Sequence, residues 1–270
     1  MILHWLRLDA SGVSRLEPLP ALAMHYQGPV NAEGYRRRAR GEEPPIAHRF
    51  STSGGVRTIQ LNPDQPADIL GPPARRLTFI VSGKIILTDD GGQVAVLERG
   101  NLFFTEGSVG LRGSARHRGP CRLVQVTVTS RWPETGAAPL TLPEPPTAPA
   151  RAPNLQRLYK GESERAYFRS FHELFAAPPG QWSAQRPVTG FRICTLADGT
   201  FIDWHPEVVN QVVLVLSGEI ALESSGDRRN ERFLAGDVCL AEDRTGIGHI
   251  DRIRGLTALC LLVMEDLDLW

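Results

Sequence analysis

Short runs of apolar residues, each ended by glycine, proline, asparagine or aspartate, recur along most of the chain. Runs of about five residues with such boundaries are typical of β-strands. Apolar residues fill all or nearly all of the segments 77–81 (LTFIV) and 212–216 (VVLVL), a pattern that indicates strands covered on both faces. We therefore predict an all-β protein in which the outer faces of these two strands meet between domains or across a homodimer.

The two halves of the chain repeat the same succession of strands and turns. The first half contains FIVSGKIILTDDGG and then RGNLFFTE, and the second contains LVLSGEIALESSGD and then AGDVCLAE. Gly83 and Gly218 lie 135 positions apart, and Gly100 and Gly236 lie 136 positions apart. A repeat of this length predicts two tandem β-barrels built on the same plan.

Composition divides the chain into four segments. Residues 1–45 are irregular and predict an extended N-terminal arm, whereas the proline-rich residues 131–153 predict a linker. The remaining segments are a first barrel at 46–130 and a second barrel at 154–270. At 162–176 the apolar residues follow helical spacing, although the aromatic residues there also allow a strand.

Charge and cysteine content narrow the classes of partner. The 30 lysines and arginines balance the 30 aspartates and glutamates, which argues against a nucleic-acid or anionic-membrane partner. The four cysteines lie far apart without CxxC spacing, which predicts buried, reduced thiols. Apolar runs stay well below the ~18 residues of a membrane span, and the N-terminus does not read as a signal peptide. We expect a cytoplasmic protein.

Four residues of the second half form a candidate metal site. His205 and Glu207 are two positions apart in a predicted strand, so both can face the barrel interior. Gln211 follows a short turn, and His249 lies on a later strand. Two histidines and a carboxylate suit Fe(II), and the same set with glutamine as a fourth donor suits Mn, Ni or Zn. Alternatively, Pro206 turns Glu207 out of the strand, and the polar residues bind a small molecule without metal.

The spacing of these residues resembles the first motif of the cupin superfamily. Gly199, His205, Gln211 and Gly218 match that motif without a gap. Two ligand positions differ in identity, because Glu207 replaces a histidine and Gln211 replaces a glutamate. The second motif begins at Gly236-Asp237, carries about two inserted residues and ends in His249. The resemblance extends to small single-domain bacterial cupins of unassigned activity, and it implies two double-stranded β-helix (jelly-roll) barrels.

The first half lacks this set of ligands. The equivalent positions hold Leu70, Arg76 and Gly113, which are not expected to coordinate a divalent cation. We therefore predict a degenerate first barrel that supports the second. Arg75 and Arg76 offer an alternative there, an anion site at the mouth of the first barrel.

Three functions are compatible with this sequence. The leading hypothesis is a metal-dependent enzyme of the dioxygenase type that acts on a small organic molecule, with Glu207 as either a metal ligand or a general base. Isomerase or lyase chemistry would use the same ligands. The alternatives are a non-catalytic small-molecule-binding or regulatory cupin without metal, and a structural dimerisation module.

Overall fold

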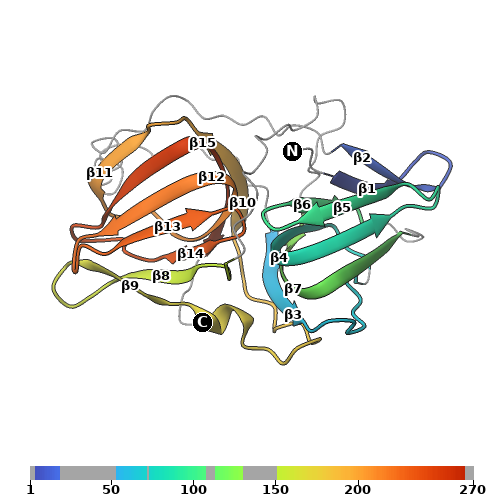
Figure 1. The fold of residues 1–270 in the computed structure, drawn as a ribbon, viewed down its shortest axis with the longest axis horizontal. Coiled ribbons are helices and arrows are strands. Elements are labelled where there is room, and N and C mark those ends of the chain that lie inside the picture. Colours follow the sequence, from blue (N-terminus) through green and yellow to red (C-terminus); the bar gives the residue numbers. More distant parts are fainter. Residues whose placement is uncertain (1–3, 19–52, 72, 108–112, 130–150, 265–270) are drawn as a thin grey trace.

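The chain forms two β-sheets, and each sheet curls into a barrel (Figure 1). The structure is a computed structural model that describes residues 4–18, 53–71, 73–107, 113–129 and 151–264. Within these ranges all regular structure is strand apart from one 3-10 helix. The predicted all-β class and the pair of jelly-roll barrels are confirmed.

The first sheet contains seven strands in the order β2-β1-β6-β4-β7-β3, with β5 paired to β4. Its strands are β1 (His4–Leu8), β2 (Ser14–Pro18), β3 (Ser53–Leu61), β4 (Arg76–Thr88), β5 (Val94–Glu98), β6 (Leu102–Thr105) and β7 (Ser114–Val128).

The second sheet contains eight strands in the order β10-β15-β12-β14-β8-β9, with β11 paired to β15 and β13 paired to β12. Its strands are β8 (Leu155–Lys160), β9 (Ala166–Ser170), β10 (Gly190–Leu196), β11 (Phe201–His205), β12 (Asn210–Ser224), β13 (Asn230–Leu234), β14 (Val238–Ala241) and β15 (His249–Met264). When the second order is read in reverse, all seven strands of the first sheet have a counterpart in the second, including β5 and β13, and β11 is an addition to the second sheet.

The paired glycines of the sequence repeat occupy equivalent positions. Gly83 (φ 85°) and Gly218 (φ 75°) both lie where the register of the long central strands shifts. A side chain at Gly83 would overlap the backbone of Pro120, and one at Gly218 would overlap Thr257. Glycine is required at both bulges because of the positive φ and the close packing.

Part of the predicted N-terminal arm belongs to the first barrel. Residues 4–18 form the hairpin of β1 and β2, and β1 pairs in parallel with β6. The buried side chains of Trp5 and Leu6 explain the order of this short segment, because they join the barrel cores. The first barrel therefore begins at β1 and not at residue 46. Residues 19–45 of the predicted arm and most of the predicted linker lie outside the described residues.

The segment at 162–176 contains no α-helix. It forms β9 and then the short 3-10 helix η1 (His172–Phe175). From there residues 171–188, which we term the strap, run along the edge strand β3 of the first barrel. Backbone hydrogen bonds join Gly180 to Gln60 and Arg186 to Val56. The second half of the chain thus completes an edge of the first barrel.

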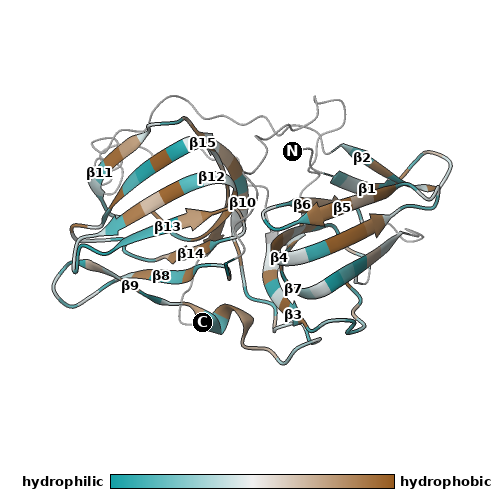
Figure 2. Ribbon diagram, viewed as in Figure 1, coloured by the Kyte–Doolittle hydropathy of each residue, from teal (hydrophilic) through white to brown (hydrophobic). Residues whose placement is uncertain are grey.

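Three clusters of buried apolar residues make up the core. One lies inside each barrel, and the third joins the barrels through their outer faces. In β4 and β12 alternate residues point to different clusters: Phe79 and Leu214 join the shared cluster, whereas Ile80 and Val213 lie inside the two barrels. Figure 2 shows the hydrophobic residues along these strands. The prediction that their outer faces meet between domains is confirmed, and a homodimer stays a prediction.

Replacing Leu214 with alanine tests this shared core. Leu214 is 1% exposed, so the change removes buried methyl groups and is expected to lower the free energy of unfolding by about 2–5 kcal/mol. Urea denaturation measures the loss. Leu256→Ala is the matched control, because that leucine is 49% exposed and its loss should cost less than about 0.5 kcal/mol.

Three of the four cysteines have the predicted character. All four are free, and Cys121, Cys239 and Cys260 are buried, whereas Cys194 is half-buried, so the prediction of burial is wrong for that residue. Burial raises the pKa of the Cys121 thiol to about 12, so that thiol is protonated at neutral pH.

In the part of the chain that the structure describes, no helix is long and apolar enough to cross a membrane.

Candidate metal centre

Two histidines face each other inside the second barrel. β11 pairs antiparallel with β15, and His205 is in register with His249. The centroids of the two imidazole rings lie 4.5 Å apart, and the ring planes are inclined by 49°. Both residues are 1% exposed. The structure thus brings together two predicted ligands that are 44 positions apart in the sequence.

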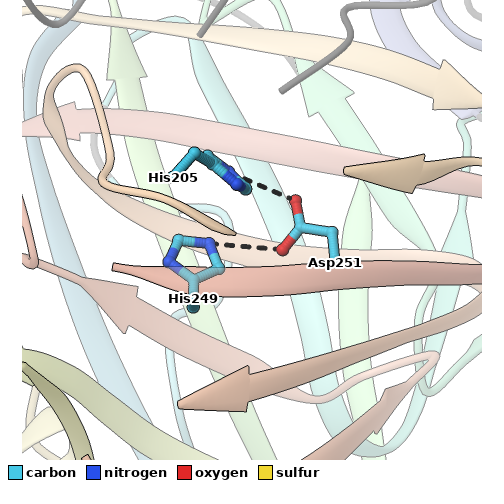
Figure 3. Close-up of side chains that lie close together, drawn as sticks. All are labelled: His205, His249 and Asp251. Atoms are coloured by element: carbon cyan, nitrogen blue, oxygen red, sulfur yellow. Dashed lines mark ion pairs between the residues drawn. The ribbon is translucent and has the colours of Figure 1, made fainter. Parts of the chain in front are cut away.

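The carboxylate of Asp251 lies beside the two rings and turns one oxygen toward each of them (Figure 3). Asp251 follows His249 by two positions on β15, so both side chains point to the same face of the strand. One carboxylate oxygen is 3.2 Å from His249 Nε2, and the other is 3.7 Å from His205 Nε2. One ligand atom from each of the three residues lies within 4.8 Å of the other two.

The Nδ1 atoms of both rings point away from this group toward oxygen atoms. His205 Nδ1 is 2.9 Å from the backbone oxygen of Asp203, and His249 Nδ1 is 2.7 Å from Asp243 Oδ2. Because a carbonyl oxygen or a carboxylate accepts, Nδ1 is the donor in each pair. A neutral ring then carries its lone pair on Nε2, the atom that faces Asp251. This arrangement is the usual one around metal-binding histidines.

Glu207 lies near the histidines but not on the strand that carries His205. β11 ends at His205. After Pro206, the backbone N–H of Glu207 donates to the backbone oxygen of Asp243 at 3.3 Å. Glu207 Oε1 is 3.9 Å from His249 Nε2. The expected strand geometry of His205 and Glu207 is therefore wrong, because the proline ends the strand between them.

Gln211 on β12 faces the interior of the second barrel, where it contacts Glu207. It has the same parity along β12 as the interior residue Val213. Its side-chain amide donates a hydrogen bond to the Glu207 carboxylate. Burial nevertheless raises the pKa of Glu207 to about 7.

The sequence analysis did not predict that Asp251 and Asp243 belong to the site. For Asp251 the signal was present, because the i, i+2 spacing used for His205 and Glu207 also joins His249 to Asp251. Asp243 lies in the connection before β15, where the sequence has no periodicity that would fix the direction of a side chain.

The site concentrates negative charge around the histidines. Three buried carboxylates, those of Glu207, Asp243 and Asp251, surround two imidazoles. Burial lowers the pKa of His249, but the charges of Asp243 and Asp251 outweigh burial and hold this pKa well above its usual value. Burial lowers the pKa of His205. A cation among these groups, either a proton or a metal ion, offsets the repulsion of the carboxylates.

The donor set fits a divalent metal. Two donors bound to one ion at about 2.0–2.2 Å lie roughly 3–3.5 Å apart. Asp251 Oδ1 lies 3.2 Å from His249 Nε2, within this range, and Asp251 Oδ2 lies 3.7 Å from His205 Nε2, slightly beyond it. Asp251 Oδ1 is buried, and it faces His249 Nε2 at 3.2 Å, an atom that carries no proton when the ring is neutral and Nδ1 donates to Asp243. With a neutral His249 ring, a metal ion would bind both this oxygen and Nε2.

The first barrel is different at the equivalent positions. The buried Arg76 donates from Nη1 to the Leu70 oxygen at 2.8 Å, and a side chain at Gly113 would collide with Leu6. Arg75 pairs with Glu106 at 3.5 Å. Among the described residues of this barrel no group of metal-ligating side chains comes together.

Comparisons with known proteins find similar chains among solved structures. Neither a scan against protein-family models nor a search of curated proteins finds a match. Among solved structures, the chain is similar to a cupin 2 conserved barrel domain protein from Leptotrichia buccalis, with 12% identity, coverage of 92% of this chain and 100% of that chain, and a TM-score of 0.38. A protein of unknown function from Pseudomonas syringae pv. tomato has 13% identity, coverage of 98% and 99%, and a TM-score of 0.36. Bacillus subtilis oxalate decarboxylase, which has Mn(II) centres, has 13% identity, coverage of 79% and 67%, and a TM-score of 0.26.

Proposed function

We propose that the second barrel binds a divalent metal through His205, His249 and Asp251 and acts with it on a small organic molecule. The observation that carries this proposal is the convergence of the three side chains, with both Nδ1 atoms held by oxygen and both Nε2 atoms turned toward the same carboxylate. Fe, Mn, Ni and Zn all accept this set of donors.

A metal held by two histidines and one carboxylate keeps coordination positions open for a substrate and for a second small reactant. This supports dioxygenase-type chemistry as the leading reaction class.

The residues around the metal have distinct roles in the proposal. Asp243 and the backbone oxygen of Asp203 orient the two rings, and the apolar cluster inside the barrel keeps water away from the centre.

Glu207 is the residue that we assign to proton transfer. Its carboxylate lies beside His249, outside the group of three, and Gln211 donates to it. A buried carboxylate in this place can accept a proton from a bound substrate. The alternative role, a further metal ligand, is distinguished by Glu207→Gln: a base variant retains metal and loses turnover, whereas a ligand variant loses metal.

A non-catalytic small-molecule-binding cupin is the second candidate. The observation in its favour is that a protonated His249 between Asp243 and Asp251 satisfies the same contacts without metal. In that case the barrel holds a ligand by hydrogen bonds from His205, Gln211 and His249.

Metal analysis of the purified protein separates the two candidates. The protein is purified without chelators or a metal-affinity step, reconstituted with Fe(II), Mn(II), Ni(II) or Zn(II), and analysed for bound metal by mass spectrometry. We expect close to one ion per chain, and loss of that ion in His205→Ala and in His249→Ala. His172→Ala, an exposed histidine on η1, is the control and should retain metal. A wild-type protein that takes up none of the four ions would refute the proposal.

Asp243→Asn should weaken metal binding without abolishing it. The change removes the charged partner of His249 Nδ1 but leaves all three proposed ligands in place. Loss of such a supporting group lowers metal affinity by about 10–100-fold. Competition with a chelator of known affinity measures the change, and an unaltered affinity would exclude Asp243 as a positioning residue.

A further inference from the structure

A cavity of about 500 Å³ lies outside the metal centre, where the first barrel meets the start of the second half of the chain. Its walls come from the end of β3, the bulge of β4, the middle of β7, the turn between β5 and β6, and residues 151–153. Cavities of this size are typical of small-molecule sites.

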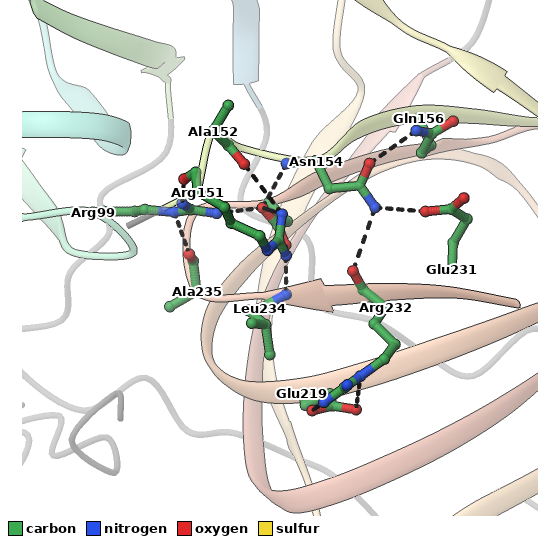
Figure 4. A network of polar contacts seen from close by, with 11 residues as sticks. Arg99, Arg151, Ala152, Asn154, Gln156, Glu219, Glu231, Arg232, Leu234 and Ala235 are labelled. Atoms are coloured by element: carbon green, nitrogen blue, oxygen red, sulfur yellow. Dashed lines mark hydrogen bonds and ion pairs between the residues drawn. The ribbon is translucent and has the colours of Figure 1, made fainter. Parts of the chain in front are cut away.

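Three arginines from separate parts of the chain line this cavity. They are Arg99 of the β5–β6 turn, Arg122 of β7 and Arg151. Among the described residues that line it there is no aspartate or glutamate. Figure 4 shows Arg99 and Arg151 approaching each other across the junction of the two halves.

One buried carboxylate forms ion pairs with two of these arginines. Asp237 is fully buried and forms ion pairs with Arg99 and with Arg151. Arg151 donates to it from both Nη1 and Nη2, and its oxygens also accept the backbone N–H groups of Asn154 and Leu234, both at 2.7 Å. Five donor contacts therefore reach a carboxylate that has roughly four lone-pair sites, and Asp237 has no capacity to balance a third guanidinium.

Arg122 supplies that third charge. Its guanidinium lies 5.5 Å from the centroid of the Phe175 ring on the strap. This contact orients the group but brings no negative charge. One carboxylate against three guanidiniums leaves the residues around the cavity with a net positive charge, and Gln60 and Ser82 are also among its lining residues.

We infer that this cavity binds a small organic oxyanion, a molecule with a phosphoryl group or with two carboxylates. Guanidinium groups recognise both through paired, charge-assisted hydrogen bonds. The inference does not depend on the proposed function, because none of the residues of the metal centre lines the cavity.

Titration calorimetry of the full-length protein at constant ionic strength tests the inference, with inorganic phosphate in one series and malonate in another. We expect saturable binding of at least one anion. Arg122→Gln should weaken it by about tenfold or more, because the change removes charge-assisted hydrogen bonds. Arg122→Lys keeps the charge but loses the planar fork, and should give an intermediate affinity.

Two controls define where the anion binds. Arg116→Gln changes an exposed arginine of the same strand that does not line the cavity, and should leave affinity unchanged. His249→Ala should also leave affinity unchanged, because it alters only the metal centre. Tighter binding of phosphate would identify a phosphoryl ligand, and tighter binding of malonate a dicarboxylate. Binding that disappears in His249→Ala, or no saturable binding of either anion, would overturn the inference.

Discussion

Asp251→Asn is expected to remove the metal from the second barrel. Asparagine keeps the size of the side chain but replaces the carboxylate beside His205 and His249 with a neutral amide. Loss of a charged ligand should cost more than the ~10–100-fold in affinity that a supporting group costs. Metal content after dialysis, and competition with a chelator, measure the effect.

Glu207→Gln is the matched comparison, because it makes the same chemical change on the neighbouring carboxylate. If Asp251 is the ligand, Glu207→Gln retains metal and Asp251→Asn does not. The opposite result would make Glu207 the carboxylate of the centre, as the spacing of the sequence motif predicts. Thermal unfolding of both variants shows whether either change disturbs the fold.

Asp237→Ala should destabilise the whole molecule. The change leaves Arg99 buried without its ion pair and removes the acceptor of two backbone N–H groups. Removing one partner of a buried ion pair typically costs about 3–5 kcal/mol. Urea denaturation should show this loss in a single transition, because the shared core couples the barrels.

An exposed ion pair provides the control for Asp237. Glu98 and Lys84 form a pair at 2.5 Å with both side chains about half exposed. Glu98→Ala should therefore lower the free energy of unfolding by about 1 kcal/mol or less. Equal losses for the two variants would show that Asp237 does not hold the junction between the barrels.

The architecture could be predicted from the sequence because the internal repeat and the fully apolar strands both depend on how the whole chain packs. A strand such as β12 must be covered on both faces, and the shared cluster around Leu214 is that cover. The hairpin of β1 and β2 was missed for the opposite reason. It consists of two strands of five residues each. What orders it is the pairing of β1 with β6, whose partner residues such as His4 and Phe103 lie 99 positions apart, and no local pattern reveals such a pairing.

The candidate site could be predicted in part. His205 and His249 were found by spacing, and the structure places them face to face. The direction of Glu207 was not predictable, because the residue after Pro206 leaves the strand, where alternation no longer applies. The role of Asp243 depends on a loop conformation that only the tertiary structure fixes.

The strap has a consequence for the order in which the chain folds as it leaves the ribosome. The first barrel is synthesised first, but β3 remains an open edge until residues 180–186 emerge and bond to it. Its outer apolar face waits still longer, for the arrival of β12. Open strand edges invite pairing with other chains, so β3 is open to such pairing until the strap is in place. The first barrel is therefore complete only when the strap and β12 have been made and packed against it.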